Sequence, residues 1–254
     1  MLTSAFYHHI RSFISRFLKV HFAGSRLKLA WVLLTPLIIS LAIACVFKEI
    51  FRIHDPALPH LILVGYLSWQ FFAGTLTQGH RLLLDQRHLY KQLSGNRHFF
   101  LAGFVSFRFI LNLPGLILVC VFIWISKSFS PSGVLLFFLA LFFLYVMTMG
   151  LTYLFSSWTV FYPDLSHGLE TGLLFYLWLS PVFYSIADMP AELKWISLIN
   201  PLAWILDLMH HGLNLKSYLP PLLAGAAIIA SSVLILYFGV LFHLKHHSEM
   251  LKRL

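Results

Sequence analysis

Six long apolar runs alternate with short polar or basic segments along the chain. The first run holds nineteen consecutive uncharged residues. An α-helix rises 1.5 Å per residue, so nineteen residues cover about 28 Å, close to the hydrocarbon thickness of a bilayer. The pattern therefore predicts an all-α integral membrane protein with six transmembrane helices. The runs are approximately residues 29–47, 61–77, 99–125, 134–155, 169–184 and 222–242.

The segment before the first run, residues 1–28, is amphipathic. Its apolar residues recur three or four positions apart, the spacing of one helix face, and basic and polar residues fall largely between them. Because a membrane run follows at once, we expect an interfacial helix lying among the lipid headgroups; the alternative is an ordinary packed helix of a soluble domain. The apolar positions are Phe6, Ile10, Phe13, Ile14, Phe17 and Leu18.

Basic residues are distributed unevenly among the polar segments. Residues 1–28 carry five Lys or Arg, residues 78–98 carry four and residues 243–254 carry three, whereas the segments after the first, third and fifth runs carry two, one and two. Lys and Arg are enriched in cytoplasmic loops, so the count predicts that both termini are cytoplasmic, as an even number of spans requires. The segment after the fourth run carries neither residue and gives no orientation.

The composition is that of a protein dissolved mainly in lipid. Hydrophobic residues make up 59% and charged residues 11%, against about 25% charged residues in soluble domains. The net charge of +9 is accounted for by cytoplasmic loops and anionic headgroups, so we expect membrane lipids and no nucleic acid as partners. The chain has no GxxxxGK[ST] and no HExxH motif, and we expect no catalytic residue, metal site or cofactor on it.

Arg108 is the main charged residue inside an apolar run. An ionisable residue at membrane depth usually marks a functional site. The alternative is that Arg108 lies near the cytoplasmic end of a long helix and extends its charge toward the headgroups. The sequence leaves both interpretations open.

Three short motifs, in order along the chain, carry a resemblance to a known family. The first precedes and enters the first run, the second follows the fourth run, and the third begins at the end of the fifth run. Together they resemble the ABC-2-type permeases that export polysaccharides such as O-antigen, capsule and teichoic acid, although Pro163 stands where the family usually has Arg. The residues that carry the resemblance are Gly24, Ser25, Leu27, Trp31 and Pro36; Phe161 to Leu165 apart from Pro163; and Ser180-Pro181, Tyr184, Pro190 and Asn200-Pro201-Leu202.

The resemblance implies a single transmembrane domain over residues 1–254 that works as a homodimer in the bacterial inner membrane. Two copies of a separate P-loop ATPase subunit would hold the ATP and Mg²⁺. The segment 78–98 would be the coupling loop that docks on the ATPase, through Arg87, Leu89, Tyr90 and Lys91. The segment 185–217 would form short re-entrant helices that gate the extracytoplasmic exit, with Pro190, Asn200 and Pro201 at the gate.

Aromatic residues are abundant, at 17% of the chain. Sugar rings stack on aromatic faces, and the polar groups of Tyr and Trp can bond sugar hydroxyls at a wet boundary. We therefore expect a glycan path lined by aromatic residues of the second and fifth runs, together with Arg108. The alternative is that these rings are interfacial anchors. The candidates are Tyr66, Trp69, Phe72, Tyr176, Trp178, Phe183 and Tyr184.

The function these observations favour is the transmembrane subunit of an ATP-driven exporter for a lipid-linked polysaccharide, such as lipopolysaccharide O-antigen. One alternative is a permease for a drug or a small lipid. A second alternative is an integral-membrane glycosyl- or acyltransferase. Such an enzyme would need acidic and His side chains close together inside the membrane, and the apolar runs hold almost no acidic residues.

Overall fold

Helices form nearly all of the regular structure in this computed structural model, which describes residues 11–19, 27–53, 55–93, 97, 99–125 and 130–254. No strand occurs in these ranges, so the all-helical prediction is confirmed. One long helix coincides with most of each predicted apolar run. These helices are α2 (Leu27–Glu49), α3 (Leu58–Gly79), α6 (Phe99–Ile125), α7 (Pro131–Phe161), α8 (Leu165–Leu179) and α11 (Pro221–Lys245).

Four of these helices, α2, α6, α7 and α11, are long and apolar enough to cross a membrane, judged by length and composition. α8 has 15 residues, about 22 Å, because Ser180-Pro181 ends it, and this falls short of an apolar core of about 30 Å. α3 has 22 residues but carries polar side chains such as Ser68, Gln70 and Thr75 along its length. Four spans are thus supported, and the six-span topology stays a prediction.

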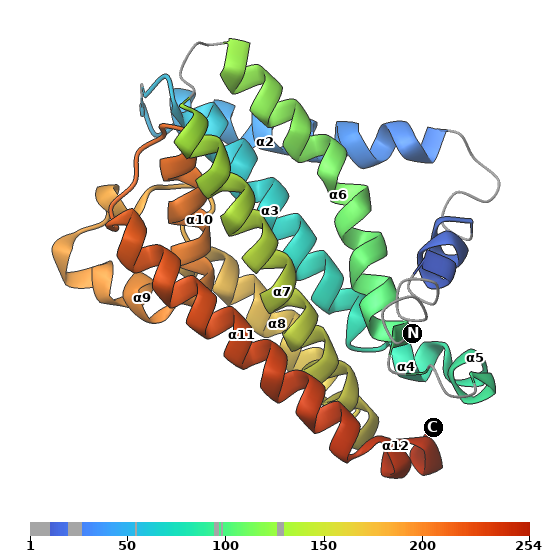
Figure 1. Ribbon diagram of the computed structural model, residues 1–254. Coiled ribbons are helices and arrows are strands. Elements are labelled where there is room, and N and C mark those ends of the chain that lie inside the picture. Colours follow the sequence, from blue (N-terminus) through green and yellow to red (C-terminus); the bar gives the residue numbers. More distant parts are fainter. Residues whose placement is uncertain (1–10, 20–26, 54, 94–96, 98, 126–129) are drawn as a thin grey trace.

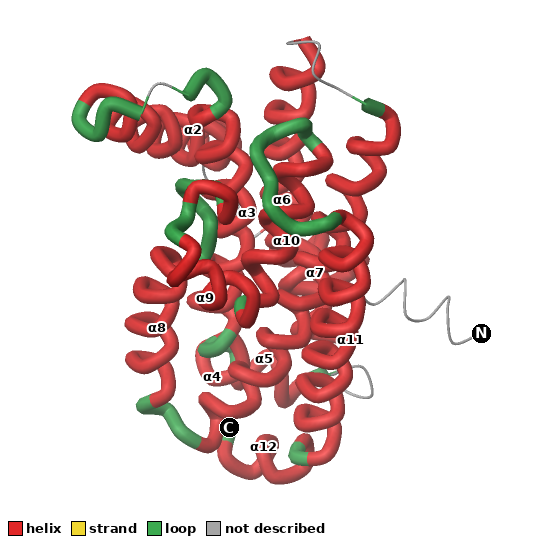
Figure 2. Tube along the Cα trace, turned by 90° about the vertical axis from the view of Figure 1, so that its left-hand side faces the viewer, coloured by secondary structure: helices red, strands yellow, loops and turns green. Residues whose placement is uncertain are grey.

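The long helices differ in direction. In Figure 1, α3, α6, α7 and α11 run roughly along one axis, whereas α2 lies across α3 and α6. Figure 2 shows α8 on one side of the bundle, beside the short helices that follow it. The protein covers only part of α2, where residues such as Trp31, Ile38 and Leu41 are 54–63% exposed.

α7 and α11 pack backbone against backbone. A Cβ atom added to Gly239 would overlap the carbonyl group of Gly150, so only glycine allows this approach. The same device recurs where α10 (Pro201–Gly212) meets the start of α7, at Gly212 and Gly133. α10 is therefore held deep in the protein, and Ile205, Leu206 and Met209 on it are fully buried.

Short helices lie at both ends of the bundle. α4 (Leu82–Asp85), α5 (Arg87–Gln92) and α12 (His247–Arg253) lie at one end, close to the C-terminus (Figure 1). Toward the other end, α8 is followed by two 3₁₀ turns, α9 (Lys194–Ile199) and α10. Asn200 separates α9 from α10, so the segment 185–217 contains short helices, as we expected.

The described part of the N-terminal segment, residues 11–19, is helical and amphipathic. Arg11 and Arg16 are exposed, whereas Phe13 is buried against Phe100 and Gly103 of α6. Phe17 also lies against rings of α6. The apolar face of this helix is thus covered in part by α6, and its interfacial position stays a prediction. The remainder of the segment up to residue 26 lies outside the described residues.

Candidate functional site

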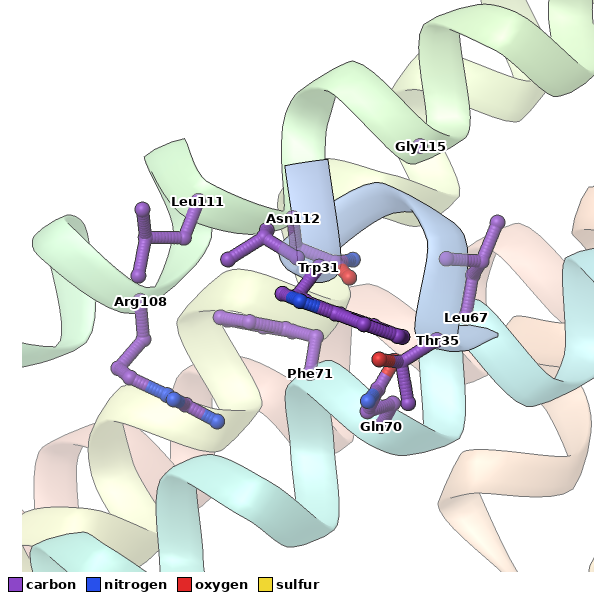
Figure 3. Close-up of a pocket in the computed structure, with 10 residues that line it drawn as sticks. Trp31, Thr35, Leu67, Gln70, Phe71, Arg108, Leu111, Asn112 and Gly115 are labelled. Carbon is purple, nitrogen blue, oxygen red and sulfur yellow. The ribbon is translucent and has the colours of Figure 1, made fainter. Parts of the chain in front are cut away.

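A pocket of about 430 Å³ lies between α2, α3 and α6, around Arg108; we call it the Arg108 pocket. Figure 3 shows the side chain of Arg108 extending from α6 toward α3, with Asn112 one helical turn further along α6. Gln70 and Thr35 line the pocket from α3 and α2. Apolar side chains including Leu67, Phe71 and Leu111 complete its walls.

Donor groups in the Arg108 pocket lack partners. Nε of Arg108 and Nδ2 of Asn112 are buried and make no hydrogen bond within the described part of the chain. No ion pair among the described residues includes Arg108, so no carboxylate there neutralises its charge. The ion pairs present join Lys48 to Glu49, Arg81 to Asp85, Lys216 to Asp188 and Arg253 to Glu249. An unpaired buried donor is costly, and such groups call for an explanation other than packing.

The aromatic residues that we expected along a glycan path lie between α3 and the end of α8 and form two sets of contacts, which we together call the aromatic cluster. One set joins Trp69, Phe72 and Tyr176, and the other joins Tyr66, Trp178, Phe183 and Tyr184. None of them lines the Arg108 pocket, so the structure separates Arg108 from the rest of the predicted set. The hydroxyl of Tyr184 also donates a hydrogen bond to the carbonyl of Trp178, at 3.0 Å. The centroid distances are 6.1 Å for Trp69–Tyr176, 6.0 Å for Phe72–Tyr176, 6.5 Å for Tyr66–Phe183 and 5.7 Å for Trp178–Phe183.

Burial divides this cluster into two groups. Trp69, Phe72 and Phe183 are at most 7% exposed and act as core packing within the subunit. Trp178 is 64% exposed, and with Tyr184 it lines a second pocket of about 360 Å³, which we call the exit pocket. Asp188 and Pro190 also line the exit pocket, so its aromatic faces lie beside a carboxylate, which is paired with Lys216. This combination of rings and an acceptor suits sugar hydroxyls and CH faces.

Asn200 joins α8 to α10. Its side-chain oxygen accepts hydrogen bonds from the backbone N–H groups of Leu202 and Ala203, which makes it the N-cap of α10. The same oxygen accepts a hydrogen bond of 2.5 Å from the hydroxyl of Tyr176. The amide nitrogen of Asn200 donates a hydrogen bond to Oγ of Ser180. The hydroxyl of Tyr176 is therefore committed to this junction. Of the other two predicted gate residues, Pro190 is exposed, and Pro201 follows Asn200 as the first residue of α10.

The four predicted coupling residues of α5 differ in where they lie. Arg87 and Lys91 are exposed, Leu89 is half-buried and Tyr90 is fully buried. Two exposed basic residues spaced i, i+4 present charge on one side of the helix.

Tyr90 fastens α5 to the C-terminal part of the chain. Its hydroxyl lies 3.3 Å from Nε2 of His243 and 3.2 Å from Nδ1 of His247. Oγ of Ser157 on α7 lies 2.8 Å from the other ring nitrogen of His243. Burial raises the pKa of Tyr90, against the lowering effect of Arg97, so the phenol stays protonated at neutral pH. We call Tyr90, Ser157, His243 and His247 the histidine junction.

Three groups of functional or structural residues were missed from the sequence. The carboxylate of Asp207 accepts hydrogen bonds from the N–H groups of Tyr218 and Leu219 and so ties α10 to the loop before α11. Its position as an acidic residue between apolar neighbours was the available signal. Gln70 and Asn112 carry the same signal, a polar side chain within an apolar run. The pairing of Tyr90 with His243, 153 residues away, had no local signal.

Comparison with known proteins places the chain among membrane transporters. The model of the ABC-2 type transporter family matches residues 8–214. The chain is 24% identical over 194 residues to an O-antigen export system permease protein, RfbA, of Klebsiella pneumoniae, covering 73% of this chain and 72% of that protein. It is 26% identical over 184 residues to the RfbA protein of Myxococcus xanthus, covering 71% and 70%.

The family match covers well over half of the chain and contains α2, α3, α6, α7, α8 and α10, with both pockets. It also agrees with the resemblance carried by the three sequence motifs. The chain belongs to the ABC-2 type transporter membrane family.

Proposed function

We propose that this chain is the transmembrane subunit of an ATP-driven exporter that moves a lipid-linked polysaccharide across the bacterial inner membrane. The observation that carries the proposal is its similarity, over about seven-tenths of its length, to permeases of O-antigen export systems. We further propose that it works as a homodimer, with two copies of a P-loop ATPase and with both termini in the cytoplasm.

The end of the bundle formed by α4, α5 and α12 supports the coupling role. Arg87 and Lys91 are exposed there, and Lys252 and Arg253 of α12 are exposed nearby in the chain's last helix. The histidine junction holds α5 against the ends of α7 and α11, so a force on α5 would reach both long helices. A docked ATPase could thus move the bundle through α5, with ATP and Mg²⁺ bound on its own chain.

The exit pocket supports a sugar polymer as cargo. Trp178 offers an exposed ring face beside Tyr184 and Asp188. Asn200 is bonded next to this pocket, because its amide nitrogen donates to the carbonyl of Leu179, which lines it. Through Tyr176 and Ser180 it links α8 to the short helices of the segment 185–217, which we propose as the gate. In the proposed homodimer, a ring exposed on the surface of one subunit can line the space between the two subunits.

Site-specific photocrosslinking tests this proposal. A photoreactive amino acid at Lys91, on exposed α5, is expected to capture a P-loop ATPase in cells, whereas the same probe at exposed Trp195, toward the other end of the bundle, is expected to capture none. Removal of the chain is expected to abolish surface glycan and to leave lipid-linked glycan inside the cell. The proposal is wrong if the purified complex lacks an ATPase subunit or if surface glycan is unchanged.

A further inference from the structure

The Arg108 pocket combines unpaired positive charge with apolar walls. The guanidinium group has five N–H donors and no acceptor. Its Nε and Nδ2 of Asn112 are buried without partners among the described residues, and no carboxylate there balances the charge. The ligand that satisfies these groups is an anion with several acceptor oxygens, and a planar guanidinium fork matches phosphate and carboxylate oxygens best.

The depth of Arg108 narrows the choice of anion. α6 has 27 residues, about 40 Å, which exceeds an apolar core of about 30 Å. Arg108 lies nine residues from Phe99, about 14 Å along the helix. The stretch of α6 that qualifies as a membrane span by length and composition, Phe99–Ile117, contains Arg108. Phosphate esters are the anionic groups that bilayer lipids and lipid carriers bring into contact with a membrane-spanning helix.

The walls of the pocket fit the chain attached to such a phosphate. Leu67, Phe71 and Leu111 line it beside the polar groups, and its volume of about 430 Å³ exceeds that of a phosphate alone. Trp31 lines the pocket and is 57% exposed, so the pocket reaches the outer surface of the subunit, where a lipid tail can remain in the bilayer. An amphiphile is therefore accommodated with its head at Arg108 and its tail outside.

We propose that the Arg108 pocket binds the phosphate group of an amphiphile, with Arg108 and Asn112 as donors. For the diphosphate of a lipid-linked glycan this rests on the proposed function, and for a bilayer phospholipid it does not. Gly74 of α3 is part of the site because a Cβ atom there would lie 2.6 Å from a terminal nitrogen of Arg108. The missing side chain leaves room for the guanidinium group against α3.

Titration calorimetry on the full chain in maltoside detergent, which contains no phosphate, tests the proposal. The probes are farnesyl diphosphate, short-chain phosphatidylglycerol and farnesol. Farnesyl diphosphate is expected to bind at least about ten-fold more tightly than farnesol, and Arg108→Gln to weaken its binding by about ten-fold or more, because a hydrogen bond to a charged group is lost.

Two variants serve as matched tests. Arg81→Gln removes the same charge from an exposed side chain paired with Asp85, and binding is expected to stay within about two-fold of the unmodified chain. Gly74→Ala displaces the flexible end of Arg108 while keeping its charge, and it is expected to weaken binding without unfolding the protein. This second variant keeps the test decisive if Arg108→Gln fails to fold.

The two sources of phosphate are distinguished by the probes. Preference for farnesyl diphosphate assigns the site to a carrier diphosphate, and equal, Arg108-dependent binding of phosphatidylglycerol assigns it to a bilayer lipid; both support a phosphate site. The proposal is overturned if neither phosphate probe binds, or if Arg108→Gln and Arg81→Gln bind alike. Because neither ATPase nor glycan is present, failure of the export proposal would leave this result unchanged.

Discussion

The two halves of this bundle are closed in different ways. On one side, α7, α10 and α11 meet backbone to backbone through Gly150, Gly239, Gly133 and Gly212. On the other side, α2, α3 and α6 are separated by side chains and enclose the Arg108 pocket, whose donors lack partners among the described residues. In membrane proteins small residues favour close helix packing, whereas polar residues at depth are costly and usually functional. The first half is built for rigidity, and the second half keeps space and charge for a ligand.

The difference implies that stability and function can be altered separately. A contact between backbones cannot adapt to a larger residue, since no side chain can rotate away. A pocket lined by long side chains can lose one of them with little effect on the surrounding helices. The predictions below test this contrast, beginning with the change that should cost the most stability.

Gly239→Leu is expected to destroy the folded protein. Its side chain would collide with the carbonyl of Gly150, and separating α7 from α11 should cost several kcal/mol, on the order of 4 or more. The measurement is the yield of monodisperse protein in maltoside and its melting temperature. Gly225→Leu in the same helix is the control, because a Cβ atom there has nothing within 4 Å, and its melting temperature should change little.

Phe72→Ala and Trp178→Ala divide the aromatic cluster into structural and exposed parts. Phe72 is 2% exposed, so its truncation should cost about 3–5 kcal/mol of stability through the cavity that it leaves. Trp178 is 64% exposed, so its truncation should leave the melting temperature nearly unchanged but reduce surface glycan. Equal export by Trp178→Ala and the unmodified chain would show that this ring is an anchor in the lipid.

Asn200→Ala should have an intermediate effect. It removes the N-cap of α10 and the partners of Tyr176 and Ser180, a loss of about 1–2 kcal/mol. Asn200→Asp keeps the accepting oxygen of the cap and loses the donor to Oγ of Ser180 and to the carbonyl of Leu179, so it should retain most of the melting temperature. If both variants melt alike, the cap does not hold α10 in place.

Arg108→Gln should have the smallest effect on stability, within about 0.5 kcal/mol of zero, because the described residues offer the guanidinium no hydrogen bond that would be lost. The melting temperature in maltoside measures this. A large drop would mean that Arg108 supports the fold, and the contrast between the two halves would then be incorrect.

Periodic features were predictable from the sequence because each depends on neighbouring residues. The apolar runs located α2, α3, α6, α7, α8 and α11, and Ser180-Pro181 and Pro201 marked the ends of α8 and α9. A proline has no N–H to donate and disfavours helical geometry in the residue before it, so its effect is readable locally. The direction of α2 across α3 and α6 was not predictable, since it depends on contacts among three helices.

The candidate site was predictable only in part, for a similar reason. Arg108 was recognisable because a charge in an apolar run is unusual, but its neighbours Gln70 and Thr35 belong to other helices. The aromatic set was identified as a group, yet the sequence could not separate buried Phe72 from exposed Trp178, because burial depends on which face of α3 or α8 meets another helix. Which residues line the glycan path and which form the gate stays a prediction.

The histidine junction has a consequence for biosynthesis. Tyr90 is translated long before His243 and His247, which lie more than 150 residues later in the chain. While the ribosome is still adding α11, the phenol of Tyr90 has none of its histidine partners, and α5 is not yet tied to α11. The surface that we propose for the ATPase is therefore completed only once the last long helix has been inserted. A chain that stops early would present α5 without its support, so assembly with an ATPase could itself discriminate finished subunits from unfinished ones.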